Sequence, residues 1–387
     1  MDIAVVYNFA EHPGGGDLVA LGIIETLLER GYTVSLYTFQ PEGIRRAALY
    51  FDKDLKTFDG LNVRRIEAPK AIKHPYNIYV ITKKAFSELK QHDLTIFFDD
   101  IPEPARELKK ILVYVHYPHA ARILLNQLVS YRYRGTLKGR IVWKLHSTLF
   151  RRYFLTNWDG ENIYVIANST LTYDHVFRAL RPRHLVKIYP PVQVRQIMVY
   201  TQRVGRSKED LVVYVGRIQP EKGIDDVIKV AALLRRSDVK FKIMGFGYDN
   251  KYLEYLRSLV KELGIQRGVE MEVNATREEV LESLAKAKVI VHPAHYEPFG
   301  IAVIEGLVAG CIPVVRKGFN GPWIDIVEQG RYGLGFENPE ELAQAINTII
   351  SDSRAVNIDD VAKRALEFDE EVFKNRFVAY LEDILAS

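Results

Sequence analysis

The sequence predicts an α/β protein with two doubly wound parallel sheets, one in each half of the chain. Short apolar runs alternate with amphipathic helical segments from end to end, a pattern typical of parallel strands joined by helices. The alternation breaks after the proline pair at 190–191, and 387 residues suit two hydrophobic cores better than one. We therefore expect a domain of residues 1–195, a connection near 190–210, and a second domain of residues 196–369.

The first half opens with a strand, a glycine loop and a helix. An apolar run at 3–9 precedes Gly14-Gly15-Gly16, an amphipathic helix runs from Leu18 to Gly31, and a second strand follows at 33–39. Further strands are expected at 94–100, 111–118 and 162–169, with a basic helical region before the last of these. These elements make one doubly wound domain.

The second half repeats the alternation at shorter spacing. The predicted strands are 211–218, 240–247, 269–274, 288–294, 312–317 and 332–337. The predicted helices between and after them are 223–237, 250–265, 277–287, a segment after the Pro-Phe-Gly turn at 298–300, 339–351 and a last helix from about Glu370. This half therefore forms a second domain of the same class.

Composition narrows the class of protein and its compartment. Hydrophobic residues make up 48% of the chain and charged residues 26%, and no apolar run reaches the roughly 20 residues that cross a bilayer. The first residues carry an acid where a signal peptide carries bases, Cys311 is the single cysteine, and the histidines lack metal-ligand spacing. We expect a cytoplasmic protein that needs no metal.

Charge is distributed unevenly along the chain. Residues 1–195 hold 28 Lys and Arg against 19 Asp and Glu, a balance of +9, whereas residues 196–387 hold 25 against 30, a balance of −5. No acid occurs between Leu108 and Trp158, where bases are interleaved with Leu, Tyr, Phe and Trp. This segment is either a solvated basic face or a surface for an anionic membrane or lipid-linked acceptor. Nucleic acid is the less favoured partner.

Two glutamates lie eight residues apart where a strand leads into a helix. In EPFGIAVIE, Glu297 and Glu305 flank a Pro-Phe-Gly turn at the carboxyl end of a predicted parallel strand, which is where open α/β sheets bind ligands. The N–H groups of Gly300 and Ile301 at the helix start favour an anion, and the carboxylates on either side could hold sugar hydroxyls.

Two cations follow the first strand of the second half. In VGRIQPEKGID, Arg217 comes directly after the strand and Lys222 comes five residues later, so that both could meet one ligand. A diphosphate leaving group requires such an arrangement, because Arg holds oxygens bidentately and Lys supplies a compact charge. Taken singly, each is more typical of a surface charge, and it is the company of the glutamate pair that favours a ligand site.

Other candidate residues also have structural interpretations. Gly15 and Gly16 would let a phosphate or sugar approach the backbone, or they form a surface turn. His116 projects at a sheet edge, where it contacts a sugar hydroxyl or serves structure alone. Phe299 is either buried packing or a wall of a sugar site.

Several of these stretches resemble the retaining glycosyltransferases of family 4, which have the GT-B fold. VGRIQPEKGID, GFG at Gly245 to Gly247 and EPFGIAVIEGLVAGCIPVV are similar to the donor-binding half of that family. The N-terminal glycine loop, the strand-end histidine and ANS from Ala167 follow in the family's order, so the resemblance covers nearly the whole chain. YVHYP, ANST, KIYPP and GFNGPWIDIV further resemble the α-1,2-mannosyltransferases that extend lipid-linked oligosaccharides.

The resemblance implies a fold and an activity. We expect two Rossmann-like domains facing across a cleft, with the last helix, about 370–387, returning to the first domain. The implied activity is a retaining transfer of a hexose, mannose from GDP-mannose, to a glycan or lipid-linked acceptor at the cytoplasmic membrane face. A UDP-sugar donor with another acceptor, or a sugar-nucleotide epimerase of the same fold, stays open.

The resemblance also implies roles for the matching positions. Arg217 and Lys222 would bind the donor diphosphate and replace a metal ion, while Glu297 and the backbone of 299–301 would hold the sugar. Glu305 would hold the ribose. In the implied front-face displacement the departing phosphate takes the acceptor proton.

Four further positions complete the predicted site. Gly245 would line the donor site, and Gly15 and Gly16 would close over the donor. His116 would contact or orient the sugar. The nucleotide sugar would be a co-substrate, and no other cofactor is expected.

Overall fold

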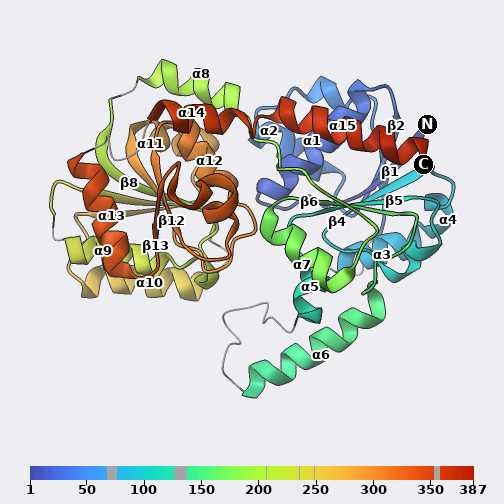
Figure 1. The fold of residues 1–387 in the computed structure, drawn as a ribbon, viewed down its shortest axis with the longest axis horizontal. Helices are drawn as coiled ribbons and strands as arrows, with labels where there is room; N and C mark the ends of the chain where they lie inside the picture. Colours follow the sequence, from blue (N-terminus) through green and yellow to red (C-terminus); the bar gives the residue numbers. More distant parts are fainter. Residues whose placement is uncertain (68–75, 126–136, 206, 235, 248, 353–357) are drawn as a thin grey trace. The chain divides into compact units, whose positions relative to one another are not determined.

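The computed structural model describes residues 1–67, 76–125, 137–205, 207–234, 236–247, 249–352 and 358–387 (Figure 1). These residues form two compact units. Unit 1 holds Met1–Pro191 with Glu371–Ser387, and unit 2 holds Val192–Glu370. The first boundary lies four residues before the expected one at 195/196, and the second lies one residue after the expected start of the last helix at about Glu370.

Unit 1 is a parallel sheet covered by helices. Its strands are β1 (Asp2–Val6), β2 (Thr33–Thr38), β3 (Asn62–Arg65), β4 (Leu94–Phe98), β5 (Ile111–Val115), β6 (Ile163–Ala167) and β7 (His184–Lys187). They are ordered β3-β2-β1-β4-β5-β6-β7, and all described pairings are parallel. The strand order therefore reverses between β1 and β4.

The helices of unit 1 include several short ones. They are α1 (Gly15–Glu29), α2 (Glu42–Tyr50), α3 (Tyr76–Lys84), α4 (Phe86–Leu89), α5 (His119–Leu124), α6 (Leu137–Tyr153), α7 (Thr170–Leu180) and α15 (Glu370–Ala386), with 3-10 turns at Leu55–Phe58 and Glu103–Glu107. The strands β3 and β7 were not predicted. β3 is short, polar and exposed, so its sequence lacks the apolar signal of a central strand.

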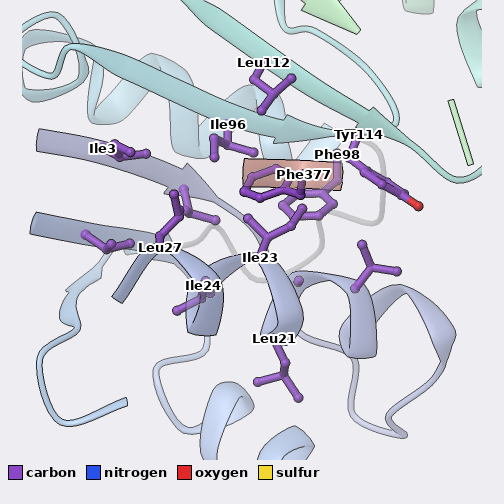
Figure 2. Packing of buried hydrophobic residues seen from close by; sticks show 14 of the residues in the cluster. Ile3, Leu21, Ile23, Ile24, Leu27, Ile96, Phe98, Leu112, Tyr114 and Phe377 are labelled. Carbon is purple, nitrogen blue, oxygen red and sulfur yellow. The ribbon is translucent and has the colours of Figure 1, made fainter. Parts of the chain in front are cut away.

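The last helix completes the core of unit 1. Side chains of α1 and of strands β1, β4 and β5 form one buried cluster, and α15 adds Phe373, Phe377, Leu381 and Ile384 to it. Figure 2 shows Phe377 among Ile23 of α1 and Phe98 of β4. The predicted return of the last helix to the first domain therefore has a direct physical cause, because its apolar face is buried there.

Unit 2 has the same architecture with six strands. They are β8 (Glu209–Val215), β9 (Lys240–Gly245), β10 (Val269–Val273), β11 (Ala287–His292), β12 (Ile312–Arg316) and β13 (Leu334–Phe336), ordered β10-β9-β8-β11-β12-β13. Its described helices are α8 (Val194–Val204), α9 (Ile224–Leu234), α10 (Asn250–Glu262), α11 (Arg277–Lys286), α12 (Ile301–Val308), α13 (Pro339–Ser351) and α14 (Ile358–Leu366). Short turns occupy Pro220–Lys222, Pro322–Ile326 and Glu328–Gly330. The strand order reverses between β8 and β11.

The connection predicted near 190–210 is wrong in one respect, because it contains the helix α8. Val194, Ile197 and Thr201 of α8 are buried, and the helix packs against α11 and α12. A short apolar stripe after two prolines gave little sequence signal, so tertiary packing decides this helix. The helix α14 was also not predicted.

Candidate functional site

The predicted donor residues of unit 2 gather where the order of its strands reverses. Arg217 and Lys222 follow β8, and Glu297 follows β11, the strand beside it. In open parallel sheets this reversal leaves a crevice at the carboxyl ends of the strands, where ligands bind. The topology therefore brings residues that are 75 positions apart into one place.

Glycines allow the loops at this edge to cross closely. Gly245 has a φ of +151°, and a Cβ placed on it would lie 1.8 Å from the carbonyl oxygen of Gly216. Beyond the strands, the N–H of Ile218 still donates to the carbonyl of Phe246 at 2.9 Å. The hydroxyl of Tyr214 donates to the carbonyl of Arg217 at 3.0 Å. These contacts fix the backbone that carries Arg217.

Lys222, which the sequence placed with Arg217 at a diphosphate, pairs with Glu297 in the structure. Its Nζ lies 2.6 Å from Oε2 of Glu297, and the two side chains are 12% and 13% exposed. Gly223, with a φ of +66°, permits this approach because a Cβ there would meet the carbonyl of Pro293 at 2.8 Å. The predicted cation and carboxylate are therefore parts of one ion pair.

His292, at the end of β11, also contacts Glu297. Its Nε2 lies 3.1 Å from Oε2 of the carboxylate. Burial raises the pKa of Glu297, but the charge of Lys222 and the hydrogen bond from His292 outweigh burial and hold that pKa well below its ordinary value. Glu297 is therefore an anion throughout the neutral range, with Oε2 occupied by protein groups.

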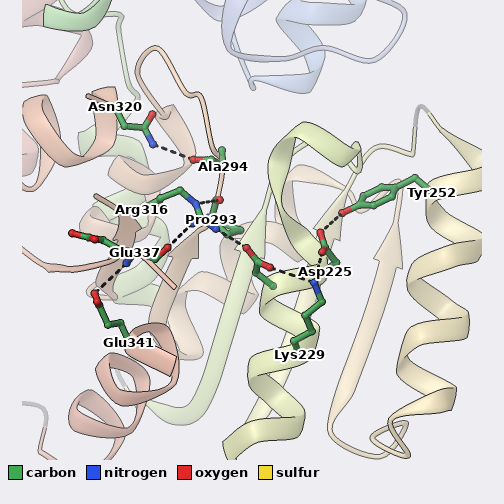
Figure 3. Close-up of polar contacts among 10 residues, drawn as sticks. Asp225, Lys229, Tyr252, Pro293, Ala294, Arg316, Asn320, Glu337 and Glu341 are labelled. Carbon is green, nitrogen blue, oxygen red and sulfur yellow. Dashed lines mark hydrogen bonds and ion pairs between the residues drawn. The ribbon is translucent and has the colours of Figure 1, made fainter. Parts of the chain in front are cut away.

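Side-chain hydrogen bonds hold the loop that carries Glu297. Asn320 accepts the N–H of Glu297 at 2.8 Å and donates to the carbonyl of Ala294 at 3.0 Å. Arg316 donates to the carbonyl of Pro293 at 2.8 Å and pairs with Asp226 at 2.6 Å. Figure 3 shows these contacts from Asn320 and Arg316 converging on the loop after β11. The carboxylate of Glu297 is thus presented by a fixed backbone.

The turn between the glutamates starts α12 as expected. Gly300 has a φ of +101° and is the N-cap residue, so a side chain there would be strained. Ile301 is the first helical residue, and its N–H is among those that an α-helix leaves without a partner. Phe299 is 2% exposed and packs edge-on against Phe368 with ring centroids 5.7 Å apart. Of the two interpretations of Phe299, the structure supports buried packing.

Glu305 lies on the next turn of α12 and is 5% exposed. Its Oε1 is 2.7 Å from Nη1 of Arg277, a residue without a predicted role. Each glutamate therefore has one oxygen held by a cation.

Arg217 differs from the other predicted residues because its side chain is exposed. Within the described ranges, its guanidinium makes no hydrogen bond or ion pair. The structure thus unites Lys222 with Glu297, whereas the side chain of Arg217 is exposed and is not part of this ion pair.

In unit 1 the glycine loop is tied down by Asp17. The carboxylate of Asp17 accepts the N–H of Gly14 at 2.8 Å and that of Ala10 at 3.0 Å. A Cβ on Gly16 would lie 3.3 Å from Oη of Tyr7 and 3.9 Å from Nε2 of His116. The interpretation of this loop as a loose surface turn is therefore wrong. Gly16 and His116 are neighbours at the carboxyl edge of this sheet.

Asp99 is a candidate that the sequence interpretation did not name. It follows β4, the strand at which the order in unit 1 reverses, and has a φ of +66°. Its Oδ1 accepts the N–H groups of His116 and Tyr117, both at 2.7 Å. Burial is the main cause that raises the pKa of Asp99 to about 7. A half-buried carboxyl group in left-handed backbone beside the predicted histidine makes Asp99 a candidate functional residue.

Four residues of these sites were missed, and two had a detectable signal. Asp99 and His292 end strands with polar side chains at the carboxyl edge of a sheet, the same property that identified His116. Asn320 and Arg277 gave no such signal, because their roles depend on contacts with residues 23 and 28 positions away.

Part of the basic segment can be described. Arg132 and Arg134 lie outside the described residues, whereas α6 carries Arg140, Lys144, Arg151 and Arg152 on its exposed surface. None of the helices in the described ranges is long and apolar enough to span a bilayer.

Comparison with known proteins agrees with this geometry. The family model described as glycosyl transferases group 1 matches residues 201–365. A GDP-Man:Man(3)GlcNAc(2)-PP-Dol alpha-1,2-mannosyltransferase of Neurospora crassa is 28% identical over 331 residues, covering 75% of this chain and 57% of that protein. The human protein of the same name is 29% identical over 239 residues, covering 57% of this chain and 48% of its own length. This chain thus spans about half the length of these relatives.

Solved structures share the architecture of the whole chain. HepE of Anabaena, in complex with UDP and glucose, superposes with a TM-score of 0.70 at 18% identity and covers 99% of both chains. Sucrose-phosphate synthase of Thermosynechococcus elongatus has a TM-score of 0.73 at 16% identity, covering 100% of this chain and 99% of that one. At such identities the likeness concerns the fold. Residues 201–365 are therefore similar to the glycosyl transferases group 1 family, and the chain has the GT-B fold.

Proposed function

We propose that this protein is a retaining mannosyltransferase that moves mannose from GDP-mannose to a glycan or lipid-linked acceptor. The observation that carries the proposal is the Lys222–Glu297–His292 cluster where the strand order of a group 1 domain reverses. The relatives' names support the choice of mannose and of a lipid-linked acceptor. Arg217 and Lys222 bind the diphosphate in this proposal.

The two cations contribute differently. Arg217 is exposed, and its planar guanidinium can donate hydrogen bonds to two phosphate oxygens at once. Lys222 is already held 2.6 Å from Glu297. As the bond to the sugar breaks, negative charge grows on the diphosphate, and fixed cations stabilise it without reorganising. These cations take the place of a metal ion. The departing phosphate accepts the acceptor's proton as the hydroxyl attacks the same face.

Glu297 binds the sugar through its remaining oxygen. Oε2 is occupied by Lys222 and His292, which leaves Oε1 to accept a hydrogen bond from a sugar hydroxyl. A charged acceptor makes a stronger hydrogen bond than a neutral one, by about 1 kcal/mol. Glu305 accepts a hydrogen bond from a ribose hydroxyl. The backbone of Gly245, Gly300 and Ile301 lies close to the donor. The roles of Gly15, Gly16 and His116, all in unit 1, stay predictions.

We place the acceptor at the cytoplasmic surface of an anionic membrane, reached through α6. Leu137, Ile141, Leu145 and Leu149 recur every four residues on one face of this helix, and their exposed fractions are 74%, 62%, 61% and 40%. Bases at 140, 144, 151 and 152 flank this stripe, and the surrounding segment holds no acid. An exposed apolar stripe between bases suits the interface of an anionic bilayer and does not suit nucleic acid.

The test combines binding with transfer. A thermal-shift series compares GDP-mannose, UDP-glucose, UDP-N-acetylglucosamine and their nucleotides, because a ligand at 100 times its Kd stabilises the native state by about 2.7 kcal/mol. GDP-mannose should raise Tm most, and a lipid-linked oligosaccharide should accept mannose with retained configuration. Arg217→Ala should lose both effects, whereas Arg257→Ala, an exposed arginine of α10, should lose neither.

Three outcomes would change the proposal. Stabilisation by a UDP-sugar alone would identify a UDP-sugar as the donor and leave the proposed transferase activity in place. Conversion of the sugar without an acceptor would indicate an epimerase. No shift with any sugar nucleotide, together with no transfer, would overturn the proposed function.

A further inference from the structure

Phe319 is an exposed phenylalanine at the tip of a tight turn in unit 2. Its side chain is 53% exposed, and the N–H of Asn320 donates to the carbonyl of Gly318 at 2.9 Å, which closes a three-residue turn around it. Gly318, with a φ of +106°, and Asn320 are residues that turns favour, whereas phenylalanine is not. A residue that breaks the local rule and is not needed for core packing is expected at functional sites.

The turn is held against the loop that carries Glu297. The side chain of Asn320 is 2% exposed and accepts the N–H of Glu297 at 2.8 Å. The N–H of Gly321 donates to the carbonyl of Glu297 at 2.9 Å, and a Cβ on Gly321 would lie 1.9 Å from the carbonyl oxygen of Pro298. The backbone of Phe319 therefore lies one residue away from two successive contacts with Glu297.

Both ends of the segment 317–322 are also anchored. The N–H of Lys317 donates to the carbonyl of Phe336 at 2.9 Å. At the other end, Pro322 lies against the N-cap of α12, since a Cβ on Gly300 would be 2.9 Å from Cγ of Pro322. A ligand can therefore bind the exposed ring of Phe319 without first ordering this backbone, which lowers the entropic cost of binding.

An aromatic ring next to a carboxylate suits a sugar. In the proposed function, Oε1 of Glu297 accepts a hydrogen bond from a sugar hydroxyl. A hexose also has C–H groups on the faces of its ring, and these are attracted to the negative face of an aromatic side chain. A phosphate would instead be repelled by the carboxylate. The surroundings of Phe319 therefore favour a sugar as its ligand.

We propose that the ring of Phe319 stacks on the C–H face of a hexose bound beside Glu297. This hexose is either the transferred sugar of the donor or the terminal sugar of the acceptor, and both offer the same chemistry to an aromatic ring. Phe319 is thus a specificity-determining residue for a sugar and takes no part in binding the nucleotide. The inference rests on the proposed function, because it requires a sugar at Glu297.

The test separates the sugar from the nucleotide. Calorimetry measures the binding of GDP-mannose and of GDP, and a transfer assay measures KM for a lipid-linked oligosaccharide that ends in mannose. If the donor sugar is the ligand, Phe319→Ala should weaken GDP-mannose roughly 3- to 10-fold and leave GDP unchanged. If the acceptor sugar is the ligand, KM for the acceptor should rise by the same factor, and both nucleotides should bind as before.

Three further variants act as controls. Phe319→Trp should keep the wild-type values because it keeps an aromatic face, whereas Phe319→Leu should recover only part of them because it keeps apolar area alone. Tyr255→Ala removes a ring of α10 that is 47% exposed in the same unit, and it should change neither sugar measurement. Thermal unfolding of Phe319→Ala should match that of the wild type, because the ring is exposed.

The inference fails on any of three results. Equal weakening of GDP and GDP-mannose in Phe319→Ala would assign the ring to the base or to the fold. Unchanged values for both sugars would exclude contact with a hexose, and full recovery by Phe319→Leu would exclude stacking. A wild type that neither binds GDP-mannose nor transfers mannose overturns the proposed function, and this inference with it.

Discussion

The carboxylate of Asp99 fixes the backbone of His116. Its Oδ1 accepts the N–H of His116 at 2.7 Å, while the side chain of Asn168 donates to the carbonyl of His116 at 3.2 Å. Both polar backbone groups of the histidine are thus held by side chains that follow the neighbouring strands β4 and β6. Its ring lies stacked against Phe98, with centroids 5.8 Å apart. The orientation of His116 is therefore set by residues on or directly after two strands, β4 and β6.

Asp99→Asn should make stability less sensitive to pH. The folded pKa of Asp99, about 7, lies above the ordinary value, so the folded state binds more protons and loses stability as pH rises from about 4 to 7. Each pH unit in that window costs up to about 1.4 kcal/mol. Asn keeps the acceptor oxygen and removes the charge. Urea unfolding at pH 5 and pH 8 measures the free energy of unfolding. Between these pH values, the free energy of unfolding of the variant should rise relative to that of the wild type.

An exposed carboxylate of the same unit is the control. Asp159→Asn should change the free energy of unfolding equally at both pH values. The interpretation of Asp99 fails if its variant behaves in the same way as this control.

Gly245→Ala should destabilise unit 2 strongly. The added Cβ would lie 1.8 Å from the carbonyl oxygen of Gly216, and the φ of +151° is rare for other residues. We expect a loss of more than about 2 kcal/mol in the free energy of unfolding, measured by urea titration. At Gly268, which has no positive φ, a Cβ would be 3.7 Å from the nearest atom, so Gly268→Ala should cost about 1 kcal/mol or less. Equal losses at both glycines would contradict the close crossing of the two loops.

The double variant Ile141→Gln with Leu145→Gln should weaken membrane binding. These side chains are 62% and 61% exposed, so their replacement should leave the fold intact. Each contributes roughly 1 to 2 kcal/mol when buried in a bilayer, which predicts at least about a tenfold loss of binding to anionic vesicles in sedimentation. Thr148→Gln, an exposed polar position of α6, is the matched control. Wild-type binding that is equal for neutral and anionic vesicles, or unchanged in the double variant, would exclude α6 as the contact.

Phe377→Ala should destabilise unit 1 because its ring is fully buried between α15 and the sheet cluster. Removing such a ring typically costs about 3 to 5 kcal/mol. Glu382→Ala, an exposed position of the same helix, should stay within about 0.5 kcal/mol of the wild type. Thermal unfolding of both variants measures the difference, and a small effect at Phe377 would show that α15 is dispensable.

The sequence was informative where one strand or helix carries its own signal. The alternation of apolar runs predicted the two parallel sheets, and polar residues at strand ends predicted Lys222, Glu297 and His116 as neighbours of the carboxyl edges. Spacing did not reveal that Lys222 pairs with Glu297, because that contact depends on the adjacency of β8 and β11. Arg277 was missed for the same reason: its partner lies on another helix, and its own surroundings resemble an ordinary helix start.

The return of α15 to unit 1 has a consequence for biosynthesis. Phe373, Phe377, Leu381 and Ile384 belong to the core built by the first residues of the chain, and they are translated after all of unit 2. During synthesis, unit 2 can therefore complete its core while unit 1 still exposes the apolar surface that these side chains cover. Unit 1 therefore finishes folding only after the residues of α15 have left the ribosome, and until then its uncovered apolar surface favours aggregation.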